Sequence, residues 1–126
     1  MNNSKRKEYV DTIRKQYFDA HRPERKLPNS FYIIIPEVAS FYIRDKGIYP
    51  LNGELYNTLT LANISVEESK QNQGIGSLIL DTLLEINPYD LFIGECVHNP
   101  ISVKMLKDRN FFEDTNRPNN YFRFSP

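Results

Sequence analysis

The stretch SKQNQGIGSLIL, Ser69 to Leu80, places two glycines and several small polar side chains directly before a run of apolar residues. Apolar side chains then follow the spacing of an amphipathic helix, at Ile75, Leu78, Ile79, Leu83 and Ile86. Asn87 and Pro88 are expected to end this helix. Before the loop, Thr58–Val66 (TLTLANISV) is rich in alternating and β-branched residues, which predicts a central strand. The centre of the fold is therefore a strand, a glycine loop and a helix.

The glycine loop has two interpretations. The first amides of a helix have no intrahelical partner and lie at the positive end of its dipole, so a helix start can bind a phosphate without a basic side chain. Gly74 and Gly76 would let a bulky anion approach the backbone. Alternatively, the glycines serve only a tight turn and close packing of the helix on the sheet. The stretch matches neither a Walker loop nor the G-x-G-x-x-G dinucleotide fingerprint.

The segments before the central strand predict a helix and further β structure. Ser4 is expected to cap a first amphipathic helix, and two prolines make His21–Ser30 a loop. The β-rich runs Phe31–Ile35 and Val38–Ile43 predict a hairpin, or one strand bent at the proline between them. Asp45–Asn57 contains two glycines and a proline, which predicts a long turn.

The segments after the glycine-loop helix predict short alternating elements. They are a strand at Leu91–Val97, a helix at Pro100–Arg109 and two short strands at Phe111–Glu113 and Tyr121–Phe124. The order strand, helix, strand, helix predicts an α/β fold.

Composition and charge bound the class of protein. The chain has 126 residues, of which 40% are hydrophobic and 25% charged, which predicts one globular domain over residues 1–126. No apolar stretch is long enough to span a bilayer, and the N-terminus lacks the apolar core of a secretory signal. Cys96 is the single cysteine, so an internal disulfide is excluded. We therefore expect a cytoplasmic protein with no membrane partner.

The charges of the whole chain balance, with 16 Lys and Arg against 16 Asp and Glu, so we expect no nucleic-acid partner. One region is uneven. Residues 1–26 contain eight basic and four acidic residues, a local charge of +4. A solvated helix face is the commoner meaning of such a segment, and contact with a phosphate backbone is the alternative. Salt-dependent binding to DNA or RNA would reveal the latter.

The residues of the loop resemble a known family. Gln71-Asn72-Gln73-Gly74-Ile75-Gly76 fits every defined position of Q/R-x-x-G-x-G/A, the acyl-CoA loop of the GCN5-related N-acetyltransferases (GNAT). The link Val66–Ser69 is similar to the one that this family places between strand and loop. The strand LFIGECV, Asn99, a short helix and an aromatic strand then follow at the expected distance. The resemblance covers Thr58–Phe112, whereas residues 1–57 agree only in the general order of elements.

The resemblance implies a fold and a cofactor site. The fold is a mixed, mostly antiparallel sheet flanked by helices, with a splayed pair of parallel strands. The co-substrate is acetyl-CoA, whose pantetheine arm would pair with the backbone of Ile64, Ser65 and Val66. The amides that would hold the pyrophosphate belong to Gln71, Asn72, Gln73, Gly74, Ile75, Gly76 and Ser77. Asn99 and Ser102 would face the cofactor from the opposite wall.

The sequence departs from the family pattern at two positions. The family often has a tyrosine seven residues after the asparagine, which acts as general acid toward the leaving thiolate, and this chain has Leu106 there. That route for protonating the thiolate is therefore missing. The glycine that usually precedes the aromatic residue of the next strand is Asn110, which is compatible with a left-handed backbone.

Two residues are candidates for catalysis. Glu95 lies in an otherwise apolar strand and is the first choice for general base, directly or through water, although a strand-end glutamate can also be structural. Tyr121 could replace the missing acid, although an aromatic residue in YFRF could equally be core. A main-chain N–H near Ile64 or Ser65 could stabilise the oxyanion.

Other chemically active side chains are weaker candidates. Glu67 and Glu68 could deprotonate an amine, but paired acids in a loop are usually solvated. Cys96 in an apolar strand is expected to be an inert small hydrophobic residue. His21 and His98 lie far apart in the sequence, so we expect no metal site, although His98 could line a substrate cleft.

The sequence therefore predicts an acyl-CoA-dependent N-acetyltransferase. Transfer would be direct, in a ternary complex, to an amine of a small molecule or a polypeptide. Two alternatives stay open: a non-catalytic CoA- or protein-binding module, favoured by Leu106, and a nucleic-acid-directed protein, suggested only by residues 1–26. A homodimer is also left open, since short chains of the family often close their sheet against a partner subunit.

Overall fold

The computed structural model describes residues 1–22, 24 and 29–126. The elements in chain order are α1 (Asn3–Ala20), β1 (Asn29–Ile35), β2 (Ala39–Leu51), β3 (Glu54–Val66), a 3₁₀ turn (Glu68–Lys70), α2 (Ile75–Ile86), β4 (Leu91–Gly94), α3 (Pro100–Asp108), β5 (Phe112–Glu113) and β6 (Tyr121–Phe124). The prediction that Ser4 caps the first helix is wrong: α1 begins earlier, at Asn3, and the side chain of Asn2 caps it by accepting a hydrogen bond from the N–H of Lys5. Asn99 caps the start of α3, and Asn87 ends α2 as predicted.

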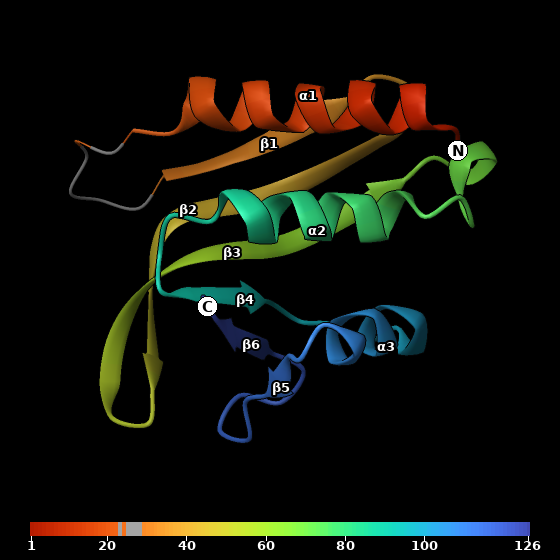
Figure 1. Ribbon diagram of the computed structural model, residues 1–126. Helices are drawn as coiled ribbons and strands as arrows, with labels where there is room; N and C mark the ends of the chain where they lie inside the picture. Colours follow the sequence, from red (N-terminus) through yellow and green to blue (C-terminus); the bar gives the residue numbers. More distant parts are fainter. Residues whose placement is uncertain (23, 25–28) are drawn as a thin grey trace.

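One six-stranded mixed sheet organises these elements, in the order β1-β2-β3-β4-β6-β5. Among the described strands, β3 and β4 form the one parallel pair, because α2 crosses over between them. Figure 1 shows α1 and α2 side by side on one face of the sheet, and α3 beyond the carboxyl end of β4. The predicted fold class, a mostly antiparallel α/β sheet with one parallel pair, is confirmed.

The long turn predicted for residues 45–57 is wrong. β2 continues to Leu51 and β3 begins at Glu54, so the turn consists of Asn52 and Gly53 alone. Both have positive φ, 52° and 83°, as a two-residue hairpin turn requires. Gly47 lies where the register of the two strands shifts, at a bulge. Pairing of two long strands therefore outweighed the local turn preferences of the glycines and proline.

Other boundaries also differ from the prediction. β1 begins at Asn29 rather than Phe31, and β4 ends at Gly94 rather than Val97. The remainder of the loop predicted for His21–Ser30 lies mainly outside the described residues. The early end of β4 matters most, because it takes Glu95 and Cys96 out of the strand and into the segment that leads to α3.

The main core lies between the helices and one face of the sheet. Inward side chains alternate along the strands, as period-two geometry requires, at Ile33, Ile35, Phe41, Ile43, Leu59 and Phe92. α1 and α2 cover them with apolar stripes that include Ile13, Tyr17, Ile79 and Leu83. A second cluster of Leu51, Leu91 and Ile93 lies apart from this core, where Tyr49, Tyr56 and Phe122 pack against it.

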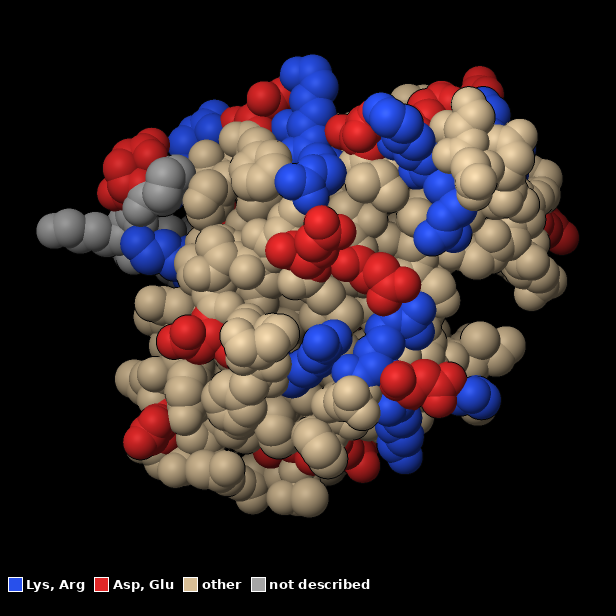
Figure 2. Space-filling view, in the orientation of Figure 1, with Lys and Arg blue, Asp and Glu red and all other residues tan. Residues whose placement is uncertain are grey.

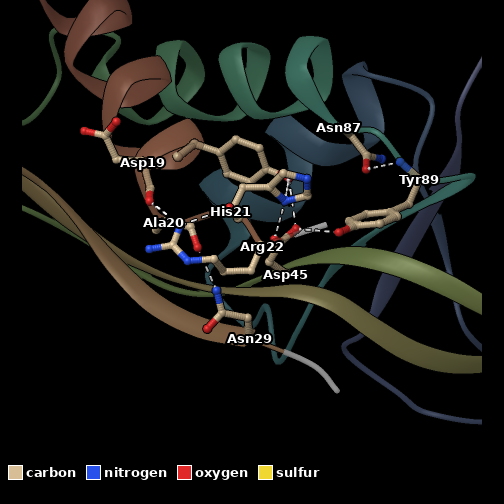
Figure 3. A network of polar contacts seen from close by, with 9 residues as sticks. Asp19, Ala20, His21, Arg22, Asn29, Asp45, Asn87 and Tyr89 are labelled. Atoms are coloured by element: carbon tan, nitrogen blue, oxygen red, sulfur yellow. Dashed lines mark hydrogen bonds and ion pairs between the residues drawn. The ribbon is translucent and has the colours of Figure 1, made fainter. Parts of the chain in front are cut away.

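A buried carboxylate ties the end of α1 to the sheet (Figure 3). Asp45 of β2 is 1% exposed, and its Oδ1 accepts hydrogen bonds from the hydroxyls of Tyr17 at 2.9 Å and Tyr89 at 2.8 Å. Its Oδ2 lies 2.6 Å from Nδ1 of His21. Burial, followed by the charge of Asp45, raises the pKa of the Tyr17 phenol far above its ordinary value. The network joins α1, β2 and the segment between α2 and β4.

We predict that Asp45→Asn lowers the free energy of unfolding by about 2–4 kcal/mol, because the amide leaves a buried hydroxyl or imidazole without its acceptor. Urea denaturation followed by circular dichroism measures the change. Asp19→Asn is the matched control: Asp19 belongs to the same helix end but pairs with Lys15 at the exposed surface, so its loss should cost at most about 0.5 kcal/mol. Equal effects of the two substitutions would contradict the role of Asp45.

Candidate functional site

The parallel pair β3 and β4 separates part-way along β3. The two strands pair only from Thr58–Leu91 to Leu61–Gly94, and the N–H of Glu95 makes a last hydrogen bond of 3.1 Å to the C=O of Leu61. β3 then continues to Val66 with β2 on one side. Among the described residues, no strand pairs with the other side of residues 62–66. This part of β3 therefore presents a backbone edge of the kind that an extended ligand can join.

A bulge in β3 lies at the same place. β2 pairs Tyr42 with Asn63 and Ile43 with Leu61, so Ala62 is an extra residue without a partner. Bulges bend a strand and increase its twist. Here the bulge falls immediately after the last residue that pairs with β4, so both features contribute to opening the sheet.

Two adjoining cavities occupy this opening. The inner cavity, of about 310 Å³, lies where the strands separate and is lined in part by Leu61, Leu80, Glu95, Val97 and Leu106. The loop cavity, of about 370 Å³, is lined in part by Val66, Gln71, Gly74, Gly76 and Ser77. Both are lined by Ile64, Asn99, Ser102 and Met105. Together they form one cleft that runs from the glycine loop to the end of β4.

The glycine loop brings the start of α2 to this cleft. Gly74 precedes the helix with φ at 79°, and Asn72 is also left-handed, with φ at 65°. The amides of residues 75–77 belong to the first helical turn, before any intrahelical acceptor is available. The side-chain amide of Gln71 donates to the C=O of Val66 at 3.2 Å, which ties the loop to the end of β3.

The structure brings most of the predicted cofactor residues into the cleft. Those that line it are Ile64, Val66, Gln71, Asn72, Gly74, Ile75, Gly76, Ser77, Asn99 and Ser102. Ser65 instead lines a separate hollow with Ser40 and Glu67. The side-chain amide of Gln73 turns back to the C=O of Ser69 at 3.4 Å. Asn99 also caps α3, since its Oδ1 accepts a hydrogen bond from the N–H of Ile101.

Glu95 lies at the inner cavity, but in an environment that the sequence did not predict. It follows β4 instead of lying within it, and its side chain is 29% exposed. Its Oε2 accepts a hydrogen bond from Nη1 of Arg44, which comes from β2. No local sequence signal could have joined these residues, because they meet only through the strand order β2-β3-β4.

The other catalytic candidates occupy different places. Tyr121 is 5% exposed, belongs to the main core and does not line either cavity, and burial raises the pKa of its phenol. Cys96 is exposed and lines the inner cavity with φ at 55°, so the prediction of a buried strand cysteine is wrong. His98 also lines that cavity. Leu106 is 3% exposed, and Asn110 is left-handed as expected, with φ at 65°.

Within the described part of the chain, no group of three His, Cys, Asp or Glu side chains could hold a metal ion. None of the described helices is long and apolar enough to cross a membrane.

A second buried carboxylate, that of Asp114, is linked by hydrogen bonds to the segment that carries Glu95. The side-chain oxygen of Asn120 accepts a hydrogen bond of 2.9 Å from the N–H of Cys96, and the hydroxyl of Tyr49 contacts the amide of Asn120 at 3.4 Å. Tyr49 donates in turn to Asp114, at 2.5 Å. Burial would raise the pKa of Asp114, but its hydrogen bonds with Tyr49 and a backbone N–H outweigh burial and hold that pKa below its ordinary value of 3.8.

We predict that this network weakens in acid. Because the pKa of Asp114 is lower in the folded than in the unfolded chain, its contribution to stability is present above pH 3.8 and is lost as the pH falls through the folded value. Asp114→Asn should therefore lose less stability than the wild-type protein between pH 5 and pH 2, measured by urea denaturation. Identical pH dependence of the two proteins would contradict the role of Asp114.

Comparisons with known proteins find similar folds among solved structures. Neither a protein-family model nor a curated protein matches the chain. A solved chain of the KacTA–DNA complex matches with a TM-score of 0.61 and 12% identity, over 94% of this chain and 80% of that one. A mutant AtaT toxin bound to the C-terminus of the antitoxin AtaR also matches at 0.61, with 14% identity, over 88% and 72%. The corresponding structure with acetyl-CoA has a TM-score of 0.56 at the same identity and coverage.

The chain has a GNAT-like fold. An acetyltransferase of the GNAT family from Staphylococcus aureus Mu50 matches over 100% of this chain and 96% of that one, at 15% identity and a TM-score of 0.46. The matches to the KacTA and AtaT structures, with TM-scores of 0.56 to 0.61 at 12–14% identity, show a shared fold and nothing beyond it. What a GNAT-like fold does in this chain has to be argued from the residues of its cleft.

Proposed function

We propose that this protein is an N-acetyltransferase that moves an acetyl group from acetyl-CoA directly to an amine in a ternary complex. The observation that carries the proposal is the continuous cleft, which joins an open helix start to the free backbone edge of β3. The amides of the helix start suit a pyrophosphate. The backbone edge of β3 suits the pantetheine arm, whose own amides can pair with it. A carboxylate, Glu95, lies at the inner end, where the acetyl group would be.

The space around Gly76 supports the binding of a bulky anion at the glycine loop. A Cβ added at this position would lie 3.9 Å from Sδ of Met105, which lines the cleft from α3. The free protein therefore has room for a side chain there, and the space that glycine leaves open belongs to the cleft. At Gly74 the positive φ of 79° is a separate reason for glycine, because L side chains rarely adopt it.

The residues of the inner cavity can perform the transfer. Glu95, directly or through one water, accepts the proton of the attacking amine, and a backbone N–H near the bulge in β3 stabilises the oxyanion. The nitrogen forms its bond to the carbonyl carbon as the carbon–sulfur bond breaks. Since Leu106 offers no acid, the CoA thiolate leaves as the anion and takes its proton from solvent.

The comparisons support this proposal at the level of the fold. One AtaT structure contains acetyl-CoA. The match with AtaT covers 88% of the chain of this protein and 72% of the AtaT chain. The same structures contain an antitoxin segment, and the KacTA complex contains DNA. For this chain, the expectation of no nucleic-acid partner stays a prediction. Figure 2 shows Lys and Arg interspersed with Asp and Glu over the face that carries α1 and α2, without a field of one sign.

We predict that acetyl-CoA binds saturably to the purified protein and that Gly76→Val weakens its binding at least about tenfold, because the side chain displaces the anion from the helix amides. Isothermal titration calorimetry measures both. Glu85→Val is the control for a β-branched residue in the same helix, since Glu85 is exposed and outside the cleft. Equal affinity of wild-type protein and Gly76→Val would remove the loop from the site.

We predict that Glu95→Gln lowers kcat by about 10²- to 10⁴-fold and leaves acetyl-CoA affinity nearly unchanged, because the amide cannot accept the proton. The assay offers spermidine, a lysine-containing peptide and a peptide with only a free N-terminus as acceptors. Release of CoA is followed by chromatography, because the exposed thiol of Cys96 would react with thiol reagents. A fully active variant would move the role of base to another group.

The second candidate function is a CoA-binding module without transfer. Leu106 favours it, because the position that often bears the general acid of the family is occupied by a buried apolar side chain. Saturable binding of acetyl-CoA without release of CoA to any of the three acceptors would support this alternative. Absence of binding in a folded sample would exclude both functions.

A further inference from the structure

Arg44 meets Glu95 at the inner cavity although the two lie far apart in the chain. Arg44 is on β2, directly opposite Thr60 of β3, and Glu95 follows the last residue of β4. The neighbours of Arg44 in β2, Ile43 and Asp45, are buried on the helix side. Because side chains alternate along a strand, Arg44 lies on the opposite face of the sheet. The ion pair therefore spans the three central strands on the face that α1 and α2 leave uncovered (Figure 1).

The guanidinium of Arg44 is held on a second side by an aromatic ring. Its Cζ lies 5.9 Å from the centroid of Tyr42, within the range of a cation–π contact. Tyr42 packs in turn against Tyr32 of β1, with ring centroids 4.8 Å apart. The side chains of Arg44 and Glu95 are 40% and 29% exposed. The pair is thus accessible to a substrate or water, yet its arginine has contacts on two sides that restrict it.

The contact leaves one carboxylate oxygen of Glu95 available. Arg44 binds Oε2, and among the described residues Oε1 has no hydrogen-bond partner. The backbone of Glu95 is also held, by its N–H bond to Leu61. A carboxylate on a flexible side chain would otherwise sample several rotamers, at a cost of lost orientation during proton transfer. With its backbone and its Oε2 both held, Glu95 has a restricted carboxylate on a residue that lines the inner cavity.

We propose that Arg44 is a positioning residue, which holds the carboxylate of Glu95 so that its free oxygen accepts the proton of the incoming amine. This inference rests on the proposed acetyltransferase function. Arginine suits the task because its planar donors fix direction as well as distance. Arg44 itself lines neither cavity of the cleft.

The test compares Arg44→Gln, Arg44→Lys and the double variant Arg44→Gln/Glu95→Gln with wild-type protein. The acceptor is whichever of spermidine and the two peptides reacts fastest, and CoA release is followed by chromatography. Arg44→Gln should lower kcat by about 10- to 100-fold while the KM for acetyl-CoA stays within about twofold, since only orientation is lost. Arg44→Lys should recover part of the rate, because an ammonium replaces the charge without the planar fork.

The double variant separates positioning from general support of the fold. If Arg44 acts through Glu95, then Arg44→Gln changes kcat by no more than about twofold once Glu95 is already glutamine. Arg14→Gln is a matched control, because Arg14 is also 40% exposed, pairs with a glutamate and lies over the ring of Phe18, but is on α1. It should leave kcat unchanged. Arg44→Met keeps the aliphatic stem against Tyr42 and replaces the glutamine variant if that variant does not fold.

An unchanged kcat in Arg44→Gln would overturn the proposal, and so would the same fold-loss from that substitution in both backgrounds. Full activity of Glu95→Gln would overturn it as well, but would leave acetyl transfer standing. Failure of the proposed function is distinguishable from these results, because it appears as absence of acetyl-CoA binding, or of CoA release, in the wild-type protein. A loss of acetyl-CoA binding in Arg44→Gln alone would show a structural role and equally overturn positioning.

Discussion

The cleft of this protein exists because the parallel pairing of β3 with β4 is short. Their parallel contact ends at Leu61 and Gly94, and the backbone of Cys96 turns away with φ at 55°. The next amides find partners outside the parallel pair, since Cys96 N–H donates to the side chain of Asn120 and Val97 N–H donates to the C=O of Asn119. A buried strand would not normally leave an edge unpaired. Here the unpaired edge of β3 faces a cleft, where a ligand can satisfy it.

The strand β2 connects the parts of the molecule that matter most to this cleft. Asp45 anchors the end of α1, Arg44 reaches Glu95, and Tyr49 joins Asp114 and Asn120. Asp45 and Arg44 lie on opposite faces because they are consecutive residues of one strand. Among the described residues, no buried side-chain nitrogen or oxygen lacks a hydrogen-bond partner. These polar contacts therefore fix how the neighbouring segments lie against β2, and they leave no buried polar side-chain atom of the described residues unsatisfied.

The two ends of the cleft use different chemistry. Under the proposed function, binding at the glycine loop would rely on backbone amides and on space, so a chain with balanced charge could accommodate a polyanion. At the inner end, the apolar side chains of Leu61, Leu80 and Leu106 surround polar groups near Glu95. Under the proposed function, such a lining would exclude water from the acyl group and leave one carboxylate for proton transfer.

The sequence by itself determined the central strand, the loop and the helix that follows. Thr58–Val66 and Ile75–Ile86 were predictable because hydrophobic periodicity and helix stop signals are local properties. The loop motif also led to the GNAT-like fold, and most of the residues it implicated line one cleft. These features needed no knowledge of which strands become neighbours.

Only the tertiary structure decided the rest. Residues 45–57 carry turn-forming glycines and a proline, yet they extend two strands because each strand supplies the other with hydrogen-bond partners. Tyr121 was a candidate acid, but pairing with Gly94 places it in the core, and the early end of β4 exposes Cys96. The contact of Arg44 with Glu95 joins residues 51 positions apart. Such outcomes depend on strand order and register, which are non-local and which periodicity does not encode.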